Sequence, residues 1–92
     1  MTITIEFNGQ LRQLTQATSI ERALNDGATV ADALKTLRDE YDDTFRSILY
    51  DDTGEVSTTT LILLKDEPVT RDPWPVLSDG DVITILPPIA GG

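Results

Sequence analysis

The chain has 92 residues, which suits one domain, because single cores usually occupy about 100–150 residues. It contains no cysteine and no histidine, which excludes disulfides, thiolate metal sites and thiol nucleophiles and removes the usual general base. Its formal net charge of −9, from 16 acidic and 7 basic residues, repels phosphate backbones and so argues against nucleic-acid binding.

The N-terminal third predicts a strand followed by a short helical turn. Thr2 to Phe7 alternates apolar and polar residues, as a half-buried strand does, and Asn8-Gly9 supplies a turn. Leu11 and Leu14 are three apart, which favours a helical turn. Residues 18–24 stay ambiguous: their apolar spacing is helical, yet the first strand needs a hairpin partner here.

The clearest predicted element is a helix from about Val30 to Tyr41. Thr29 and Asp32 have the spacing of a capping box, in which each side chain binds the other residue's backbone N–H. One apolar stripe follows the helical period; it consists of Val30, Leu34, Leu37 and Tyr41, with Ala33 beside it.

The second half predicts a second short helical turn and three strands. The turn holds Phe45, Ile48 and Leu49; a chain reversal at 52–54 and a strand over Val56 to Leu64 follow. Because residues 61–64 show no polar alternation, we expect that part to be covered on both faces or centrally placed. Residues 65–68 reverse the chain, and Val69-Thr70 predicts a short edge strand. The last strand is Asp81 to Leu86, and Pro87-Pro88 ends it, since proline cannot donate to a ladder.

This order of elements predicts an α+β fold of the β-grasp type. A mixed sheet of four to five strands would carry one main helix across one face, with the last strand beside the first in the middle. We expect residues 1–86 to form this domain and residues 87–92 to form a flexible tail ending in Gly-Gly.

The tail, Pro87-Pro88-Ile89-Ala90-Gly91-Gly92, is where we expect the chemistry. The two prolines give a stiff, extended exit from the sheet, and Ile89 offers an apolar anchor. Gly91 and Gly92 lack side chains, so a narrow tunnel in a partner can admit the backbone. The free α-carboxylate can then be activated with ATP as an acyl adenylate; sulfide would convert it to a thiocarboxylate, and a lysine amine would convert it to an amide.

The segment from Leu77-Ser78-Asp79-Gly80-Asp81-Val82 to the C-terminus resembles the end of the MoaD/ThiS family of ubiquitin-like sulfur carriers. This family includes the small subunit of molybdopterin synthase, the thiamine sulfur carrier and archaeal ubiquitin-like modifiers. The helix entry Gly27-Ala28-Thr29-Val30-Ala31-Asp32-Ala33-Leu34 is similar as well. Leu86 and Ile89 depart from the phenylalanine and valine common in the family but keep an apolar anchor.

The resemblance implies a second strand at residues 18–24 and a modification at Gly92. It implies partners: an adenylating enzyme of the ubiquitin-activating type that uses ATP, a sulfur donor, and a molybdopterin synthase large subunit or another sulfur acceptor. Pro87, Pro88, Ile89, Ala90 and Gly91 would enter the partner's tunnel. The chain would then be a carrier that binds no cofactor or metal and is not itself an enzyme, because the partner supplies the catalytic residues. Protein tagging through Gly92, with Lys35 and Lys65 as candidate acceptors, and a non-covalent interaction module are the alternatives.

The remaining features are open to two interpretations each. The acidity would speed encounter with a basic partner surface, or serve only solubility or a salty cytoplasm. The acidic pairs Asp42-Asp43 and Asp51-Asp52 could form a cation site, but they lack the spacing of an EF-hand loop. We expect them to be solvated carboxylates in turns. Trp74 is a partner contact or a cover for the core edge. No apolar run approaches the ~18 residues that span a bilayer, and the N-terminus lacks signal-peptide features, so we expect a cytoplasmic protein with no membrane partner.

Overall fold

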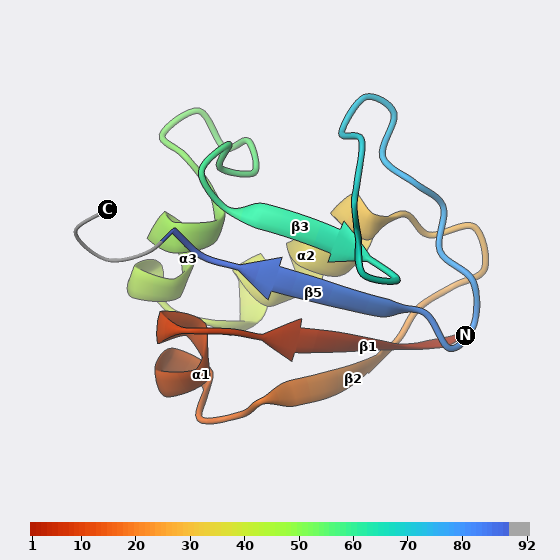
Figure 1. Cartoon of the computed structure of the whole chain (residues 1–92), viewed down its shortest axis with the longest axis horizontal. Coiled ribbons are helices and arrows are strands. Elements are labelled where there is room, and N and C mark those ends of the chain that lie inside the picture. Colours follow the sequence, from red (N-terminus) through yellow and green to blue (C-terminus); the bar gives the residue numbers. More distant parts are fainter. Residues whose placement is uncertain (89–92) are drawn as a thin grey trace.

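Five strands form one mixed sheet, and three helices accompany it in the computed structural model (Figure 1), which describes residues 1–88. In chain order the elements are β1 (Thr2–Phe7), α1 (Gln10–Thr15), β2 (Ser19–Ala23), α2 (Val30–Glu40), α3 (Asp43–Leu49), β3 (Leu61–Leu64), β4 (Glu67–Pro68) and β5 (Val82–Leu86). The strands lie in the order β2-β1-β5-β3-β4. This confirms the predicted β-grasp arrangement, with the first and last strands adjacent.

The centre of the sheet is the parallel pair β1 and β5. Ile5 pairs with Ile83 on β5 and with Ile20 on the antiparallel neighbour β2. Every second residue of β1 faces the core, as the alternation predicts, and is fully buried. The hairpin partner at residues 19–23 confirms the strand that the family resemblance implied and that periodicity left open.

The helix α2 begins where its cap predicts. The Thr29 hydroxyl accepts from the Asp32 N–H at 3.3 Å, and the Asp32 carboxylate accepts from the Thr29 N–H at 2.9 Å. Two N–H groups that a helix start leaves unpaired are thereby satisfied. The helix ends at Glu40, and Tyr41 is its extended C-cap, one residue short of the predicted end.

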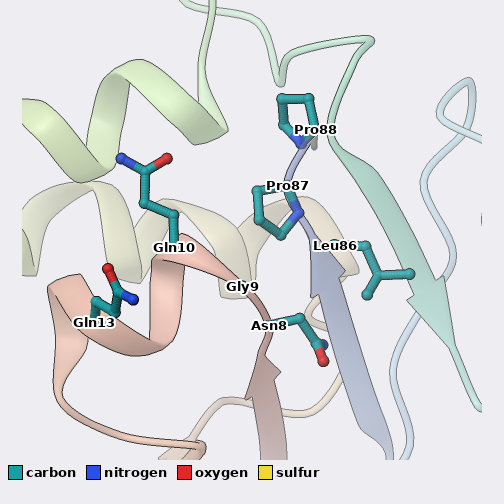
Figure 2. A pocket seen from close by; sticks show the side chains of 7 residues that line it. All are labelled: Asn8, Gly9, Gln10, Gln13, Leu86, Pro87 and Pro88. Atoms are coloured by element: carbon teal, nitrogen blue, oxygen red, sulfur yellow. The ribbon is translucent and has the colours of Figure 1, made fainter. Parts of the chain in front are cut away.

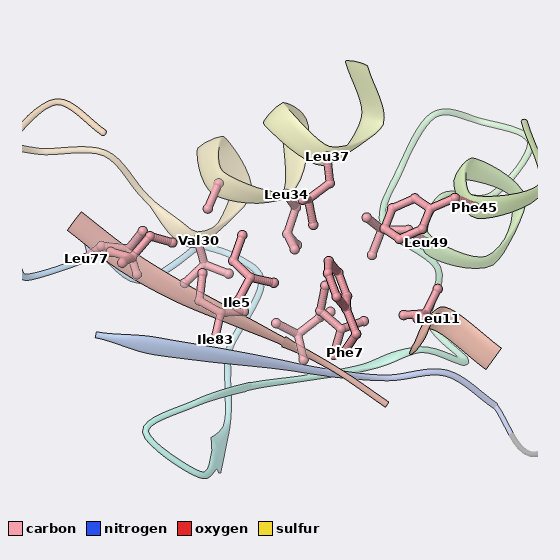
Figure 3. Close-up of a cluster of buried hydrophobic side chains, with 14 residues drawn as sticks. Ile5, Phe7, Leu11, Val30, Leu34, Leu37, Phe45, Leu49, Leu77 and Ile83 are labelled. Carbon is pink, nitrogen blue, oxygen red and sulfur yellow. The ribbon is translucent and has the colours of Figure 1, made fainter. Parts of the chain in front are cut away.

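The core lies between the sheet and the helices (Figure 3). Phe7 meets Phe45 edge-on at a ring separation of 6.0 Å, which joins β1 to the predicted short helix α3. The buried apolar residues are Ile3, Ile5, Phe7, Leu11, Val30, Ala33, Leu34, Leu37, Phe45, Leu49, Ile62, Leu77, Ile83 and Ile85. Within residues 1–88, no helix is both long and apolar enough to cross a membrane.

The predicted strand over Val56 to Leu64 is wrong in its first half, because only residues 61–64 pair in the sheet, and Val56 forms an isolated bridge with Tyr50. Residues 56–60 form a loop held by other partners: the Ser57 N–H donates to the Leu49 carbonyl at 2.8 Å, and the Thr60 hydroxyl donates to the Ile48 carbonyl at 2.7 Å. Of the two alternatives for residues 61–64, cover on both faces is wrong, since Leu61 is 45% exposed, whereas β3 does lie inside the sheet, between β5 and β4.

The edge strand is Glu67–Pro68, which corrects the prediction at Val69-Thr70. Lys65 and Asp66 both have positive φ, 53° and 66°, so they form a two-residue turn, and pairing resumes at once with Leu64 opposite Glu67. Proline is tolerated at Pro68 because an edge position needs no N–H on its outer side.

Candidate functional site: the base of the C-terminal tail

The chain leaves the sheet at the end of β5, its central strand. Leu86, the last residue of β5, pairs with Leu61 of β3, and Pro87 then lacks the N–H that would continue the ladder. Leu86 and Pro87 are half-buried and Pro88 is exposed. Of the predicted tail residues, the structure therefore places Pro87 and Pro88; Ile89, Ala90, Gly91 and Gly92 lie outside the described residues.

The turn between β1 and α1 supports this exit. The Asn8 side-chain amide donates to the Ile85 carbonyl at 3.3 Å, and the Leu11 N–H donates to the Asn8 carbonyl at 3.1 Å. Gly9, the residue after Asn8, has φ 55° and ψ −131°. Residues with a side chain adopt this backbone conformation only with strain. A Cβ at Gly9 would lie 3.4 Å from Cγ of Pro87, so this turn touches the tail's base directly.

A hollow of about 690 Å³ opens between α1 and the two prolines (Figure 2). Gln10 and Gln13 project from α1 on one side, and Leu86 and the prolines stand on the other. Its described lining carries amides and apolar groups but no ionisable side chain. We call it the tail-base groove; such a surface can bind backbone and apolar groups, whereas acid–base chemistry must come from elsewhere.

The glutamines of this groove were not predicted from the sequence. The sequence indicates only a turn at Asn8-Gly9 and a helical turn at Leu11 and Leu14. Parallel pairing of β1 with β5 brings Asn8 and Ile85, 77 positions apart, into contact. No local pattern carries that information.

The open face of the sheet presents an apolar strip beside the tail's base. Ile62 faces the core, so Leu61 and Leu63, its neighbours on β3, face the other side. Leu86 lies opposite Leu61 and Thr84 lies opposite Leu63. Figure 1 views this face, with α2 behind the sheet.

The acidic pairs are turn and cap residues, as the solvated-turn interpretation predicts. Asp42 accepts from the Phe45 N–H at 3.1 Å and caps α3. Asp51 accepts from the Thr53 hydroxyl at 2.6 Å and the Thr53 N–H at 2.9 Å, and these bonds hold the pKa of the Asp51 carboxyl below its usual value. Residues 1–88 contain no cluster of three potential metal ligands.

Trp74 covers the edge of the core. It is half-buried against the hydrophobic cluster, and the Arg71 guanidinium lies 5.6 Å from its ring centroid. This observation favours the structural interpretation of Trp74.

Comparison with known proteins relates this chain to one protein family. The model of the ThiS family matches residues 5–92. Small archaeal modifier protein 3 of Haloferax volcanii is 32% identical over 94 residues, covering the whole of both chains. The crystal structure of SAMP1 from Haloferax volcanii superposes with a TM-score of 0.88 at 22% identity over the whole of both chains. The complex of subunits 1 and 2 of the molybdopterin-converting factor from Helicobacter pylori contains a chain with a TM-score of 0.64 at 23% identity, again with full coverage of both chains.

Proposed function

Because this chain belongs to the ThiS family of ubiquitin-like carrier and modifier proteins, we propose that it carries sulfur on its C-terminal carboxylate, at Gly92. In the proposed reaction, a partner enzyme joins that carboxylate to the AMP part of ATP and releases pyrophosphate. Sulfide from a sulfur donor then displaces AMP and leaves a thiocarboxylate. The chain itself contributes a reactive end and surfaces for recognition.

The observation that carries the proposal is the exit of the chain from β5. Two prolines end the ladder at the centre of the sheet, Pro88 is exposed, and four residues follow Pro88 in the sequence. An extended chain spans at most about 3.3–3.6 Å per residue, so Gly92 can reach at most about 14 Å past Pro88. That reach suits a carboxylate delivered into a partner's buried catalytic centre.

We further propose molybdopterin synthesis as the pathway that receives the sulfur. The Helicobacter pylori relative is described in complex with the second subunit of a molybdopterin-converting factor, which supports a molybdopterin synthase large subunit as the partner here. That partner would supply the catalytic residues. ATP would be used by the adenylating enzyme, with no cofactor held by this chain.

The apolar strip of Leu61, Leu63 and Leu86 is the surface we propose for docking these partners. It adjoins the tail's base, so a partner seated there receives the tail directly. Leu61 is 45% exposed, so burying the rest of its side chain contributes roughly half of the ~1.5–3 kcal/mol expected for a fully exposed leucine.

A second candidate function is protein modification, in which the carboxylate of Gly92 forms an isopeptide bond with a lysine of a target protein. The relative that is 32% identical along the whole chain is named a modifier protein, which supports this candidate. Both functions use the same activated carboxylate and differ in the nucleophile that displaces AMP.

Intact-mass spectrometry tests the proposal. After incubation with a ubiquitin-activating-type enzyme, ATP and a sulfur source, the chain should gain the mass difference between one sulfur and one oxygen atom. A matched variant with one alanine appended after Gly92 should gain nothing, because its terminal carboxylate is displaced and flanked by a side chain. Absence of the gain in the unmodified chain contradicts sulfur carriage. Conjugates of higher mass in cell extracts that disappear on deletion of Gly92 would establish the modifier function.

A further inference from the structure

A second hollow, of about 260 Å³, lies between α2 and the loops that contain residues 50–56 and 71–74. Its chemically distinctive lining residues are Lys35, Arg38, Tyr50, Glu55, Arg71 and Trp74. None of them lines the tail-base groove or belongs to the apolar strip on the sheet. The hollow is therefore a separate surface that the proposed carrier function leaves unused.

The lining is basic in a strongly acidic protein. Three of the chain's seven basic residues meet here, against one lining carboxylate, that of Glu55. Arg38 has an ion-pair partner, Asp39, at 3.5 Å. Within residues 1–88, neither Lys35 nor Arg71 has a carboxylate oxygen within 4.0 Å. The positive charge of the hollow is thus only partly neutralised by the chain's own acids.

Two aromatic rings and a fixed guanidinium shape the hollow. The Arg71 guanidinium donates to the carbonyls of Val56, Ser57 and Thr60, at 3.0, 2.8 and 2.6 Å. These acceptors are neutral, so they hold the group in place and leave its charge intact. It lies 5.6 Å from the centroid of Trp74, and on the other side Arg38 lies 5.7 Å from that of Tyr50.

The Tyr50 hydroxyl is a hydrogen-bond donor under ordinary conditions. Burial raises the pKa of its phenol above the usual value; the charge of Arg38 opposes this and that of Asp39 adds to it. A neutral phenol beside the Arg38 guanidinium can donate to an anionic ligand, whereas a phenolate would repel one.

We propose that this hollow binds a short acidic peptide segment of a partner protein, with its carboxylates at Lys35 and Arg38 and an apolar side chain against Tyr50 and Trp74. The volume is below the roughly 300–1,000 Å³ of small-molecule sites, which suits one or two side chains. A nucleic acid or an anionic membrane extends its charge far beyond the hollow and would meet the repulsion of the net charge of −9. A peptide brings only a few carboxylates to this one place.

Trp74 is the only tryptophan, so its fluorescence reports on the hollow. The probe is a pentapeptide, acetylated and amidated, with four glutamates around a central leucine. We expect a saturable change in emission with a Kd of about 10 µM to 1 mM. A peptide with lysine in place of each glutamate should give none. Raising the salt to about 1 M, where the Debye length is about 3 Å, should weaken the complex.

Matched variants separate the hollow from the charge of the whole protein. Lys35→Gln should weaken binding about fivefold, the scale of one exposed charge contact, and the double variant Lys35→Gln/Arg38→Gln should weaken it further. Arg22→Gln removes the same charge at an ion pair with Glu40, outside the hollow, and should change the affinity less than twofold. Far-UV circular dichroism checks that each variant is folded. Arg71 is left intact because it holds the 56–60 loop.

Three results would overturn the proposal: no saturable response to the acidic peptide, an equal loss with Arg22→Gln and Lys35→Gln, or full competition by inorganic phosphate at the peptide's own concentration. The last result would identify a small-anion site instead. Deleting Gly92 should leave peptide affinity unchanged, so this proposal and the sulfur-carrier proposal can fail separately.

Discussion

Replacing Gly9 with alanine tests whether the β1–α1 turn positions the tail. Gly9 has φ 55° and ψ −131°, outside the left-handed helical region that asparagine and aspartate tolerate. The added Cβ would also lie 3.4 Å from Cγ of Pro87, at the near limit of ordinary contact. The substitution therefore strains the turn's backbone and adds an ordinary van der Waals contact with the residue from which the tail departs.

The expected loss of stability comes from the backbone and not from the contact. A residue held in a sparsely populated conformation costs about 1–3 kcal/mol, whereas a contact at 3.4 Å adds little. If the turn relaxes instead, the Asn8 amide bond to the Ile85 carbonyl and the position of Pro87 change with it. For a domain of this size, about 2 kcal/mol lowers Tm by about 8–16 °C.

Thermal unfolding and the rate of thiocarboxylate formation are the two assays. Gly54→Ala is the matched control, because Gly54 also has positive φ, 85°, but nothing lies within 4 Å of its added Cβ. Both variants should lose stability, and only Gly9→Ala should also slow loading at Gly92 at a temperature where both are folded. If Gly9→Ala costs less than about 0.5 kcal/mol, or if both variants load at the same rate, the assigned role of this turn is wrong.

Three further outcomes follow from contacts elsewhere in the fold. A lysine in Arg71→Lys cannot donate to all three carbonyls in the geometry of a guanidinium, so the free energy of unfolding in urea should fall by about 1–3 kcal/mol. The absence of a measurable fall would show that the guanidinium does not hold the 56–60 loop. Leu34→Ala opens a cavity at the buried face of α2 and should lower the free energy of unfolding by about 2–5 kcal/mol in the same assay. A loss as small as that of a surface substitution would contradict the complete burial of Leu34. Thr53→Val removes the hydroxyl donor from Asp51, so the pKa of that carboxyl should rise toward the ordinary value of an aspartate, as followed by NMR titration. In the unmodified chain, the Thr53 bond to Asp51 stabilises the fold at pH values above the unfolded-state pKa of Asp51. This stabilisation is lost as the pH falls through the lower folded-state pKa. An unchanged Asp51 titration in Thr53→Val would refute the hydroxyl bond as the cause of the lowered pKa.

The proposed carrier function and the proposed peptide binding use separate surfaces of the protein. The tail-base groove and the apolar strip meet at the exit of β5, while the basic hollow lies on α2 and its flanking loops. A partner engaged at the hollow therefore does not compete for the residues that present the tail. Simultaneous engagement at two such surfaces raises the effective concentration of the second contact.

Local features of the sequence determined the elements whose signals are local. Alternation in residues 2–7 predicted β1, and the Thr29 and Asp32 spacing predicted the start of α2, because side-chain period and capping depend only on near neighbours. The two prolines and Gly91-Gly92 predict chemistry at Gly92 from the order of residues alone, and this stays a prediction, because residues 89–92 lie outside the described part of the structure.

Tertiary structure decided everything that depends on pairing across the chain. Residues 19–23 are a strand because β1 offers them an edge, although their own spacing also suits a helix. Residues 56–60 leave the sheet because Arg71 and the end of α3 bind their backbone groups. Both hollows join segments far apart in sequence, and only the packing of α2 and the parallel pairing of β1 with β5 bring their residues together.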